Sequence, residues 1–233
     1  MRPKKSVILL ATFVAIASGL FATTRIQERL PAKSPAVVLI TSSGCRSAET
    51  RTVGTFIERR LIISVAHGVA GQTRNEITTL DGEKFNARVV AIDVRQDLAL
   101  LAIDPMPPSL KFEPVVLGKP KGGEDVYFFA FDDDSQFVRA AKIRRRLRID
   151  TEDIYLREKV SRPGLEVELS VKVGNSGGPL VNKTGELVGL VWSTSRVVAD
   201  RSWATRAEAI ESLVATAGNY PPTHQARPVA CTG

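Results

Sequence analysis

The sequence contains little of what would indicate a nucleic-acid-binding protein. Its formal net charge is +7, and three of the cations, Arg2, Lys4 and Lys5, lie in an acid-free N-terminal stretch. Without those three the charge falls from +7 to about +4, which is too weak a bias to argue for nucleic acid. Internal repeats and low-complexity tracts are also absent. These absences favour one ordinary folded domain.

Metal-ligating and cofactor-binding patterns are lacking as well. The Asp132–Asp134 cluster suggests calcium, but no further ligand spacing accompanies it, so a solvated turn is the better interpretation. The basic run Lys142–Arg148 partly alternates with apolar residues, which is typical of a strand with a solvated charged face. A patch that binds acidic substrates or membrane head-groups is the alternative for this run. The sequence implies no metal and no organic cofactor.

Cysteine is scarce, with one residue near each end of the expected domain. Cys45 and Cys231 form an even pair, which favours a disulfide in an exported chain. Such a bond could pin the C-terminal tail to the first strands. Two free thiols are the alternative.

The N-terminus has the pattern of an export signal. An uncharged, largely apolar run at residues 7–22 follows the basic residues, which indicates a signal peptide at residues 1–22. An uncleaved signal-anchor is the alternative. We therefore expect a secreted or periplasmic protein, or one tethered to a membrane with its folded domain outside the cytoplasm. Residues 23–35 are interpreted as a linker, 36–217 as one folded domain and 218–233 as a tail.

Short strand patterns fall into two groups separated by a loop-rich stretch at residues 104–123. The pattern predicts an all-β fold of two small antiparallel barrels, closed by an amphipathic helix at Ala204–Ala217. The predicted strands are Ala36–Thr41, Val53–Glu58, Leu61–Val65, Glu76–Thr79, Ala87–Asp93, Leu98–Ile103, Val126–Phe131, Val138–Arg148, Asp153–Arg157, Glu166–Val171, Pro179–Val181 and Glu186–Thr194.

The most informative segment is the serine loop Gly174–Leu180, in which glycines flank Ser176 on both sides. A serine hydroxyl needs a neighbouring base and oxyanion donors before it can act as a nucleophile. Gly174 and Gly177 allow a tight turn that can direct the amides of Gly174 and Ser176 at one spot. A plain glycine-rich turn between two strands is the alternative.

A base and an acid stand upstream of that serine. His67 follows an apolar strand, and it is the only histidine within a well-patterned region, because His224 lies in a proline-rich tail. Asp97 directly precedes another apolar strand, where it could orient an imidazole. Taken alone, His67 could be structural and Asp97 a polar strand cap. The order His67, Asp97, Ser176 is that of the chymotrypsin type of triad.

These motifs together resemble the trypsin-like serine proteases, nearest the bacterial Deg/HtrA-like branch. The resemblance rests on Leu61–His67, on the segment from Asp81 through Asp97 to Leu101, and on Gly174–Leu180 continuing to Leu190. It implies two six-stranded antiparallel β-barrels of the chymotrypsin type, with the active site in the cleft between them. Val173 stands where a proline is usual in that branch, and the chain has no room for a C-terminal PDZ domain.

The implied function is that of a serine endopeptidase acting on polypeptide substrates through an acyl-enzyme. Ser176 would be the nucleophile, His67 the base and Asp97 its orienting acid, with the amides of Gly174 and Ser176 as the oxyanion hole. A catalytically inactive protease-fold binding protein and an esterase are the alternatives. The oligomeric state is left open.

The resemblance also indicates a specificity pocket. Its floor would lie six positions before the nucleophile, at Ser170, and its wall at Trp192, Ser193 and Thr194. Ser170 carries no charge, so a buried substrate cation would find no partner there. We therefore expect small to medium uncharged side chains to be preferred over Arg and Lys.

Overall fold

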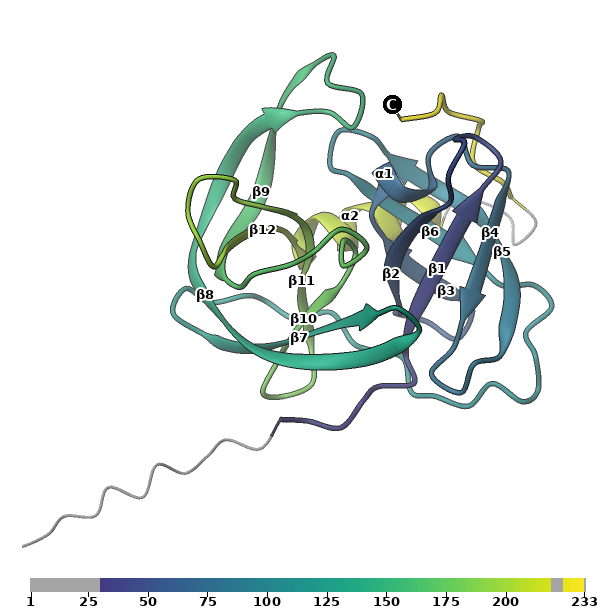
Figure 1. Ribbon diagram of the computed structural model, residues 1–233, viewed down its shortest axis with the longest axis horizontal. Coiled ribbons are helices and arrows are strands. Elements are labelled where there is room, and N and C mark those ends of the chain that lie inside the picture. The colour runs from purple at the N-terminus through teal and green to yellow at the C-terminus, as the bar shows by residue number, and fades with distance from the viewer. Residues whose placement is uncertain (1–29, 219–223, 233) are drawn as a thin grey trace, which may run out of the picture.

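Two β-barrels lie side by side and account for most of the residues that the structure describes (Figure 1). The structure, a computed structural model, describes residues 30–218 and 224–232. Each barrel is a closed antiparallel sheet of six strands, and this arrangement confirms the fold predicted from the sequence. The predicted signal segment at residues 1–22 lies outside the described residues, as does the linker up to residue 29.

The first barrel takes up the N-terminal half of the described chain, with the strand order β1-β2-β3-β6-β5-β4. Strands β1, β3 and β6 are nearly continuous apolar runs, as expected of strands that are buried on both faces. The elements are β1 (Val37–Ser43), β2 (Thr50–Phe56), β3 (Leu61–Ser64), α1 (Ala66–Val69), β4 (Arg74–Thr78), β5 (Lys84–Asp93) and β6 (Leu98–Ala102).

The second barrel follows the loop-rich connection, with the strand order β10-β11-β12-β9-β8-β7. Its longest strands, β8 and β9, form a hairpin that extends beyond the barrel toward the first one (Figure 1). The elements are β7 (Asp125–Asp132), β8 (Ser135–Glu152), β9 (Lys159–Glu168), β10 (Pro179–Asn182), β11 (Leu187–Thr194), β12 (Arg201–Arg206) and α2 (Ala207–Ala217).

One predicted strand is wrong. Residues 153–157 form the turn between β8 and β9 and not a strand. The Asp153 carboxylate accepts hydrogen bonds from the amides of Tyr155 and Arg157, each at 3.0 Å. An aspartate that bonds the backbone ahead of it gives the chain a local alternative to strand pairing.

One observed strand, β12, was not predicted. Its sequence, Arg-Ser-Trp-Ala-Thr-Arg, contains no run of large aliphatic residues, yet it pairs with both β11 and β9. Small polar residues suit it, because Ser202 and Thr205 are buried. The predicted helix at Ala204–Ala217 consequently begins only at Ala207, and it buries Ile210 and Leu213.

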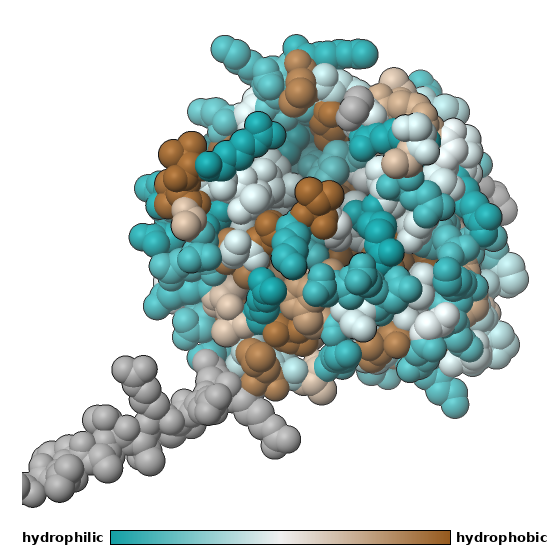
Figure 2. Space-filling model, viewed as in Figure 1, coloured by the Kyte–Doolittle hydropathy of each residue, from teal (hydrophilic) through white to brown (hydrophobic). Residues whose placement is uncertain are grey.

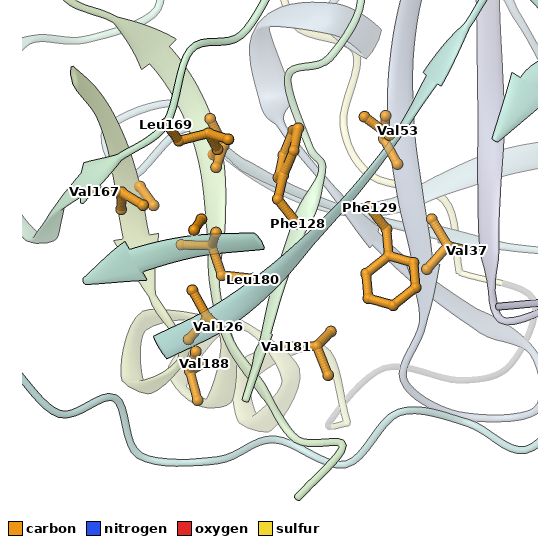
Figure 3. Packing of buried hydrophobic residues seen from close by; sticks show 14 of the residues in the cluster. Val37, Val53, Val126, Phe128, Phe129, Val167, Leu169, Leu180, Val181 and Val188 are labelled. Atoms are coloured by element: carbon orange, nitrogen blue, oxygen red, sulfur yellow. The ribbon is translucent and has the colours of Figure 1, made fainter. Parts of the chain in front are cut away.

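The largest apolar cluster spans the boundary between the barrels. It consists mainly of second-barrel residues but also contains Val37, Leu39 and Val53 of the first barrel. Figure 3 shows Phe129 of β7 beside Val37 at this boundary. Burial of each large apolar side chain contributes about 1.5–3 kcal/mol. The boundary is thus held by hydrophobic packing near the place where the candidate site residues meet.

The C-terminal tail returns to the first barrel. Cys231 is joined by a disulfide to Cys45, which lies 186 positions earlier in the chain, with a Cα–Cα distance of 5.9 Å. The neighbouring Thr232 hydroxyl donates to the backbone carbonyl of His67 at 3.0 Å. The tail thereby lies against the short helix α1 (Figure 1).

The surface is mostly hydrophilic on the face shown in Figure 2, where hydrophobic residues form small separate groups. The exposed large hydrophobic residues include Val116, Leu156, Val173 and Val197. Within residues 30–218 and 224–232, no helix has both the length and the apolar character needed to cross a membrane.

Candidate active site

His67 is presented by α1, a single helical turn that begins directly after β3. Close packing on β2 shapes this turn. A Cβ atom at Gly68 would overlap the side chain of Thr52, so only glycine lets the turn approach the strand. The Gly68 carbonyl accepts a hydrogen bond from the Thr50 hydroxyl at 2.6 Å. The backbone of the histidine turn is therefore fixed to the first barrel.

Asp97 holds His67 at two points. Its Oδ1 atom accepts the backbone N–H of His67 at 2.8 Å, and its Oδ2 atom pairs with His67 Nδ1 at 2.8 Å. The Asp97 side chain is 3% exposed, whereas that of His67 is 34% exposed. Asp97 adopts a φ of 57°, a left-handed conformation that is uncommon for residues other than glycine. The structure thus brings together two of the three residues of the predicted triad.

Burial and the contact with Asp97 shift the pKa of His67 in opposite directions. Burial lowers the pKa of His67, but the charge and hydrogen bond of Asp97 together raise it by more. The cations of Arg162 and Arg46 act in the opposite direction to Asp97. The net result is a pKa of His67 above the ordinary histidine value of 6.5.

Arg162 is a site residue that sequence reasoning missed. It lies on β9 with a side chain that is 3% exposed, and its Nη1 atom is 3.8 Å from Asp97 Oδ2. Its guanidinium group stacks on the Trp192 ring, 4.8 Å from the ring centroid. The segment around it, Val-Ser-Arg-Pro-Gly, gives no signal, because arginine followed by proline is more typical of a loop than of a buried strand.

Ser176 lies in a loop of the second barrel that is bonded to the first. Its carbonyl accepts the N–H of Val53 on β2 at 2.8 Å. Gly177 has a φ of 85°, and a Cβ atom there would overlap the Val53 carbonyl oxygen. The Ser176 hydroxyl lies 3.4 Å from the carbonyl oxygen of Trp192, to which it can donate a hydrogen bond. Only glycine fits immediately after the serine, which explains the motif physically.

The turn before Ser176 leaves two amides without partners. Gly174 has a φ of 93° within a turn closed by the N–H of Asn175 and the carbonyl of Lys172 at 3.1 Å. A positive φ at the third position is that of a type II turn. Among the described residues, the amides of Gly174 and Ser176 donate no hydrogen bond. They are therefore available to an external acceptor.

Asn175 fixes this turn from within. It is buried; its side-chain oxygen accepts the N–H of Lys172 at 3.1 Å, and its side-chain N–H donates to the Phe131 carbonyl at 2.9 Å. Both ends of the amide side chain are thus paired within the chain. One hydrogen bond within the turn and one to β7 therefore fix Asn175.

A cleft of about 550 Å³ lies between the barrels. The first barrel contributes His67 and Gly68 to its lining, and the second barrel contributes Gly174 and Ser176. No hydrogen bond joins His67 and Ser176 in the part of the chain that the structure describes. The cleft thus contains both the imidazole and the serine of the predicted triad.

The residues predicted for the specificity pocket lie in two segments of the second barrel. Ser170 is exposed after β9, and its carbonyl accepts a hydrogen bond from Arg139 at 3.4 Å. Trp192, Ser193 and Thr194 follow one another at the end of β11, where Thr194 is exposed and the other two are half-buried. Their use as a pocket stays a prediction.

The charged clusters singled out in the sequence are largely paired. Asp132 is the last residue of β7, Asp133 and Asp134 form the turn to β8, and Asp134 pairs with Arg51 at 2.8 Å. On β8, Arg144 pairs with Glu168 at 2.9 Å. Further pairs on that strand are Arg145–Glu166, Arg146–Glu208 and Lys142–Asp125. Four of the five cations in the basic run thus have local counter-ions, and the fifth, Arg148, donates to the hydroxyl and the carbonyl of Ser161.

Comparison with known proteins shows which family the chain belongs to. The trypsin-like peptidase domain matches residues 52–190. Serine protease Rv3671c of Mycobacterium tuberculosis (strain ATCC 25618 / H37Rv) is 31% identical over 197 residues, covering 82% of this chain and 48% of that protein. Serine protease HTRA1 of Xenopus laevis is 28% identical over 171 residues, covering 72% of this chain and 36% of that protein. The chain therefore spans about half the length, or less, of these curated relatives.

The fold is shared with a solved relative. The crystal structure of the Rv3671c protease from M. tuberculosis in its active form has a TM-score of 0.75 at 28% identity, covering 86% of this chain and 87% of that one. These similarities confirm the resemblance to trypsin-like and HtrA-type proteases.

Proposed function

Since the chain belongs to the trypsin-like peptidase family, we propose that it is a serine endopeptidase that works through His67, Asp97 and Ser176. The observation that carries the proposal is the double contact of Asp97 with His67 at a cleft that also contains Ser176. An acid that holds an imidazole through Nδ1 leaves Nε2 as the proton acceptor of the neutral ring.

In the proposed reaction the Ser176 hydroxyl attacks the carbonyl carbon of a peptide bond while His67 Nε2 takes its proton. The C–N bond breaks as the imidazolium returns that proton to the leaving amine, and an acyl ester remains on Ser176. The same imidazole then takes a proton from water as the water oxygen attacks the acyl carbon. The ester C–O bond breaks, the imidazolium gives its proton to Ser176 Oγ, and the carboxylic acid product leaves. Asp97 stabilises the imidazolium, in keeping with the raised pKa of His67.

The oxyanion that forms in each half-reaction needs donors in front of the nucleophile. The unpartnered amides of Gly174 and Ser176 support this assignment, because a backbone N–H left without an internal acceptor can bond the developing charge. One such donor contributes about 10²–10³ in kcat. These groups together require no metal or organic cofactor.

A protease-fold binding protein is the second candidate. The contact of the Ser176 hydroxyl with the Trp192 carbonyl, and not with His67, is the observation that favours it. An esterase that uses the same residues is a third candidate, since ester and peptide cleavage share acyl-transfer chemistry.

Digestion of a proteome-derived peptide library by the wild type and by Ser176→Ala tests the proposal. We expect cleavage by the wild type alone. Peptide binding without cleavage would support the binding protein, and turnover of esters without peptides would support the esterase.

We further propose that the substrate side chain before the cleaved bond is small to medium and uncharged. The acids nearest the proposed pocket support this, since Glu166 is paired with Arg145 and Arg201, and Glu168 with Arg144. Those carboxylates already have counter-ions and offer little to a substrate cation. The same peptide-library digest measures this preference. A strong majority of Arg or Lys before the cleaved bonds would contradict the pocket assignment without contradicting the triad.

For the cellular location we propose export, either as a secreted or periplasmic protein or as a membrane-anchored one with the protease domain outside the cytoplasm. The apolar run at residues 7–22 supports this, together with the Cys45–Cys231 disulfide, which is typical of oxidising compartments. Fractionation of the producing cells, followed by N-terminal sequencing, distinguishes a cleaved signal from a retained anchor.

A further inference from the structure

Arg162 carries a buried charge directly beside the His67–Asp97 pair. Its Nε atom donates to the Arg95 carbonyl at 2.8 Å, and its Nη2 atom donates to the Glu152 carbonyl at 2.9 Å. Its remaining nitrogen, Nη1, faces Asp97. Burial of an arginine is costly unless its donors are satisfied, so this arrangement points to a specific use.

The first contact of Arg162 is with the segment that carries Asp97. The Arg95 carbonyl lies two residues before Asp97, whose backbone is left-handed. A second side chain of the second barrel, the Thr205 hydroxyl, donates to the carbonyl of Gln96 at 3.4 Å. Residues of the second barrel thus hold the turn that presents the acid of the first barrel. An uncommon backbone conformation persists only where its surroundings fix it.

The second contact is with the carboxylate itself. The Nη1 atom lies 3.8 Å from Asp97 Oδ2, the oxygen that pairs with His67 Nδ1. At that distance the cation acts through its charge and not through a hydrogen bond, and it does not compete with the imidazole for the oxygen. Both side chains are 3% exposed, so water screens the interaction only weakly.

The third contact is with Trp192, a neighbour of Ser176. The guanidinium stacks on Trp192, whose backbone carbonyl lies 3.4 Å from the Ser176 hydroxyl. Arg162 therefore touches residues on both sides of the proposed triad. An arginine can do this because its planar group bonds in the plane and stacks on its face, whereas a lysine cannot.

We propose that Arg162 is a positioning residue for the reaction, holding the Asp97 turn in place across the barrel boundary and setting the proton affinity of His67. This inference rests on the proposed function. The charges that act on the pKa of His67 are those of Asp97, Arg162 and Arg46, and the carboxylates that act on Arg162 are those of Asp97, Asp93 and Asp153.

The sign of the electrostatic effect follows from these groups. His67 must be neutral to accept the serine proton, so activity rises with pH through the His67 pKa. Burial lowers that pKa, Asp97 raises it and Arg162 lowers it. Removal of the Arg162 cation should therefore raise the pKa further and move the rise in activity to higher pH.

The test compares Arg162→Met and Arg162→Lys with the wild type. Arg74→Met is the matched control, because it removes a cation from an exposed site on β4. The readouts are kcat and KM over a range of pH, and the imidazole titration of His67 by NMR. The chain has only two histidines, so a His224→Gln background leaves one titrating imidazole to follow.

We expect Arg162→Met to lower kcat about 10- to 100-fold with little change in KM, since misplacement of a catalytic group by about 1 Å costs about that much. Its His67 titration should move to higher pH. Arg162→Lys should keep the titration near that of the wild type but lose part of kcat, because the charge remains and the bonds to the backbone do not. Arg74→Met should match the wild type in both readouts.

An unchanged His67 titration in a folded Arg162→Met would overturn the proposal. A raised KM with an unchanged kcat would also overturn it, because it would place Arg162 in substrate binding. If Arg162→Met does not fold, Arg162→Lys decides: full kcat in that variant contradicts a positioning role. The NMR titration needs no turnover. It therefore measures the effect of Arg162 on the pKa of His67 even if the wild type is inactive and the proposed function is wrong.

Discussion

The two barrels prepare their parts of the proposed site in opposite ways. The first barrel binds His67 through closed contacts, in which both oxygens of Asp97 are occupied by the histidine. The second barrel holds Ser176 through backbone geometry and leaves the amides of Gly174 and Ser176 open. In the proposed mechanism, the acid–base pair is complete before substrate arrives, whereas the oxyanion donors beside Ser176 receive their acceptor only from the substrate.

The largest expected effect comes from removal of either reacting group. Ser176→Ala and His67→Ala should each lower kcat by on the order of 10⁶, because residues that act as one unit fail together. Peptide hydrolysis of the two single variants and the double variant measures this. Additive losses in the double variant would show that the two barrels do not cooperate in one reaction.

Asp97→Asn tests the contact between Asp97 and His67 in the first barrel. It should cost on the order of 10⁴ in turnover, since an amide cannot fix the required tautomer or stabilise the imidazolium. The Asp97 charge that raises the pKa of His67 also disappears, so the remaining activity should rise at lower pH than in the wild type. A pH profile of the purified variant checks both points, and wild-type turnover would remove Asp97 from the triad.

Gly177→Ala tests the serine loop of the second barrel, and Gly185→Ala is its matched control. Both glycines have a φ of 85°, but a Cβ at Gly177 would overlap the Val53 carbonyl, while one at Gly185 meets nothing within 4 Å. Both variants should lose about 1–2 kcal/mol of stability from the left-handed backbone. Only Gly177→Ala should also lose about 10²–10³ in kcat through a displaced oxyanion hole. Equal activity in the two variants would contradict the close fit at Gly177.

The smallest effect concerns stability as a function of pH. The pKa of His67 is raised in the folded protein, because the pairing with Asp97 outweighs the opposing effect of burial. Its contribution to stability is therefore fully present below the unfolded-state value near 6.5 and is lost as the pH rises through the folded-state pKa. Urea unfolding of the wild type and His67→Gln at several pH values should show this loss in the wild type only. Activity should increase over the same interval.

The sequence was sufficient for the parts of the site that depend on local chemistry. Gly174 and Gly177 mark a turn that only glycine can form, and the apolar strands before His67 and after Asp97 place those residues at strand ends. Both barrels followed from the same alternation of strands and turns. Such features can be predicted from the sequence because the backbone conformation at these positions requires particular residue types.

The parts that escaped prediction depend on contacts between distant segments. Arg162 is far from Asp97 in sequence, and nothing in its own strand indicates that it is buried. Strand β12 is composed of small and polar residues whose burial is decided by β9 and β11. The contact of Thr232 with the carbonyl of His67 joins positions 165 residues apart. Long-range packing of this kind leaves no periodic pattern in the sequence.

The most direct test of the central claim is covalent labelling of Ser176 by a fluorophosphonate probe, read by intact mass and by peptide mapping. The account predicts one adduct, located on Ser176, in the wild type. It predicts no adduct in Ser176→Ala and much slower labelling in Asp97→Asn at the same pH. A folded wild-type protein that forms no adduct, or that carries the adduct on another residue, would contradict the claim that His67, Asp97 and Ser176 act as one catalytic unit.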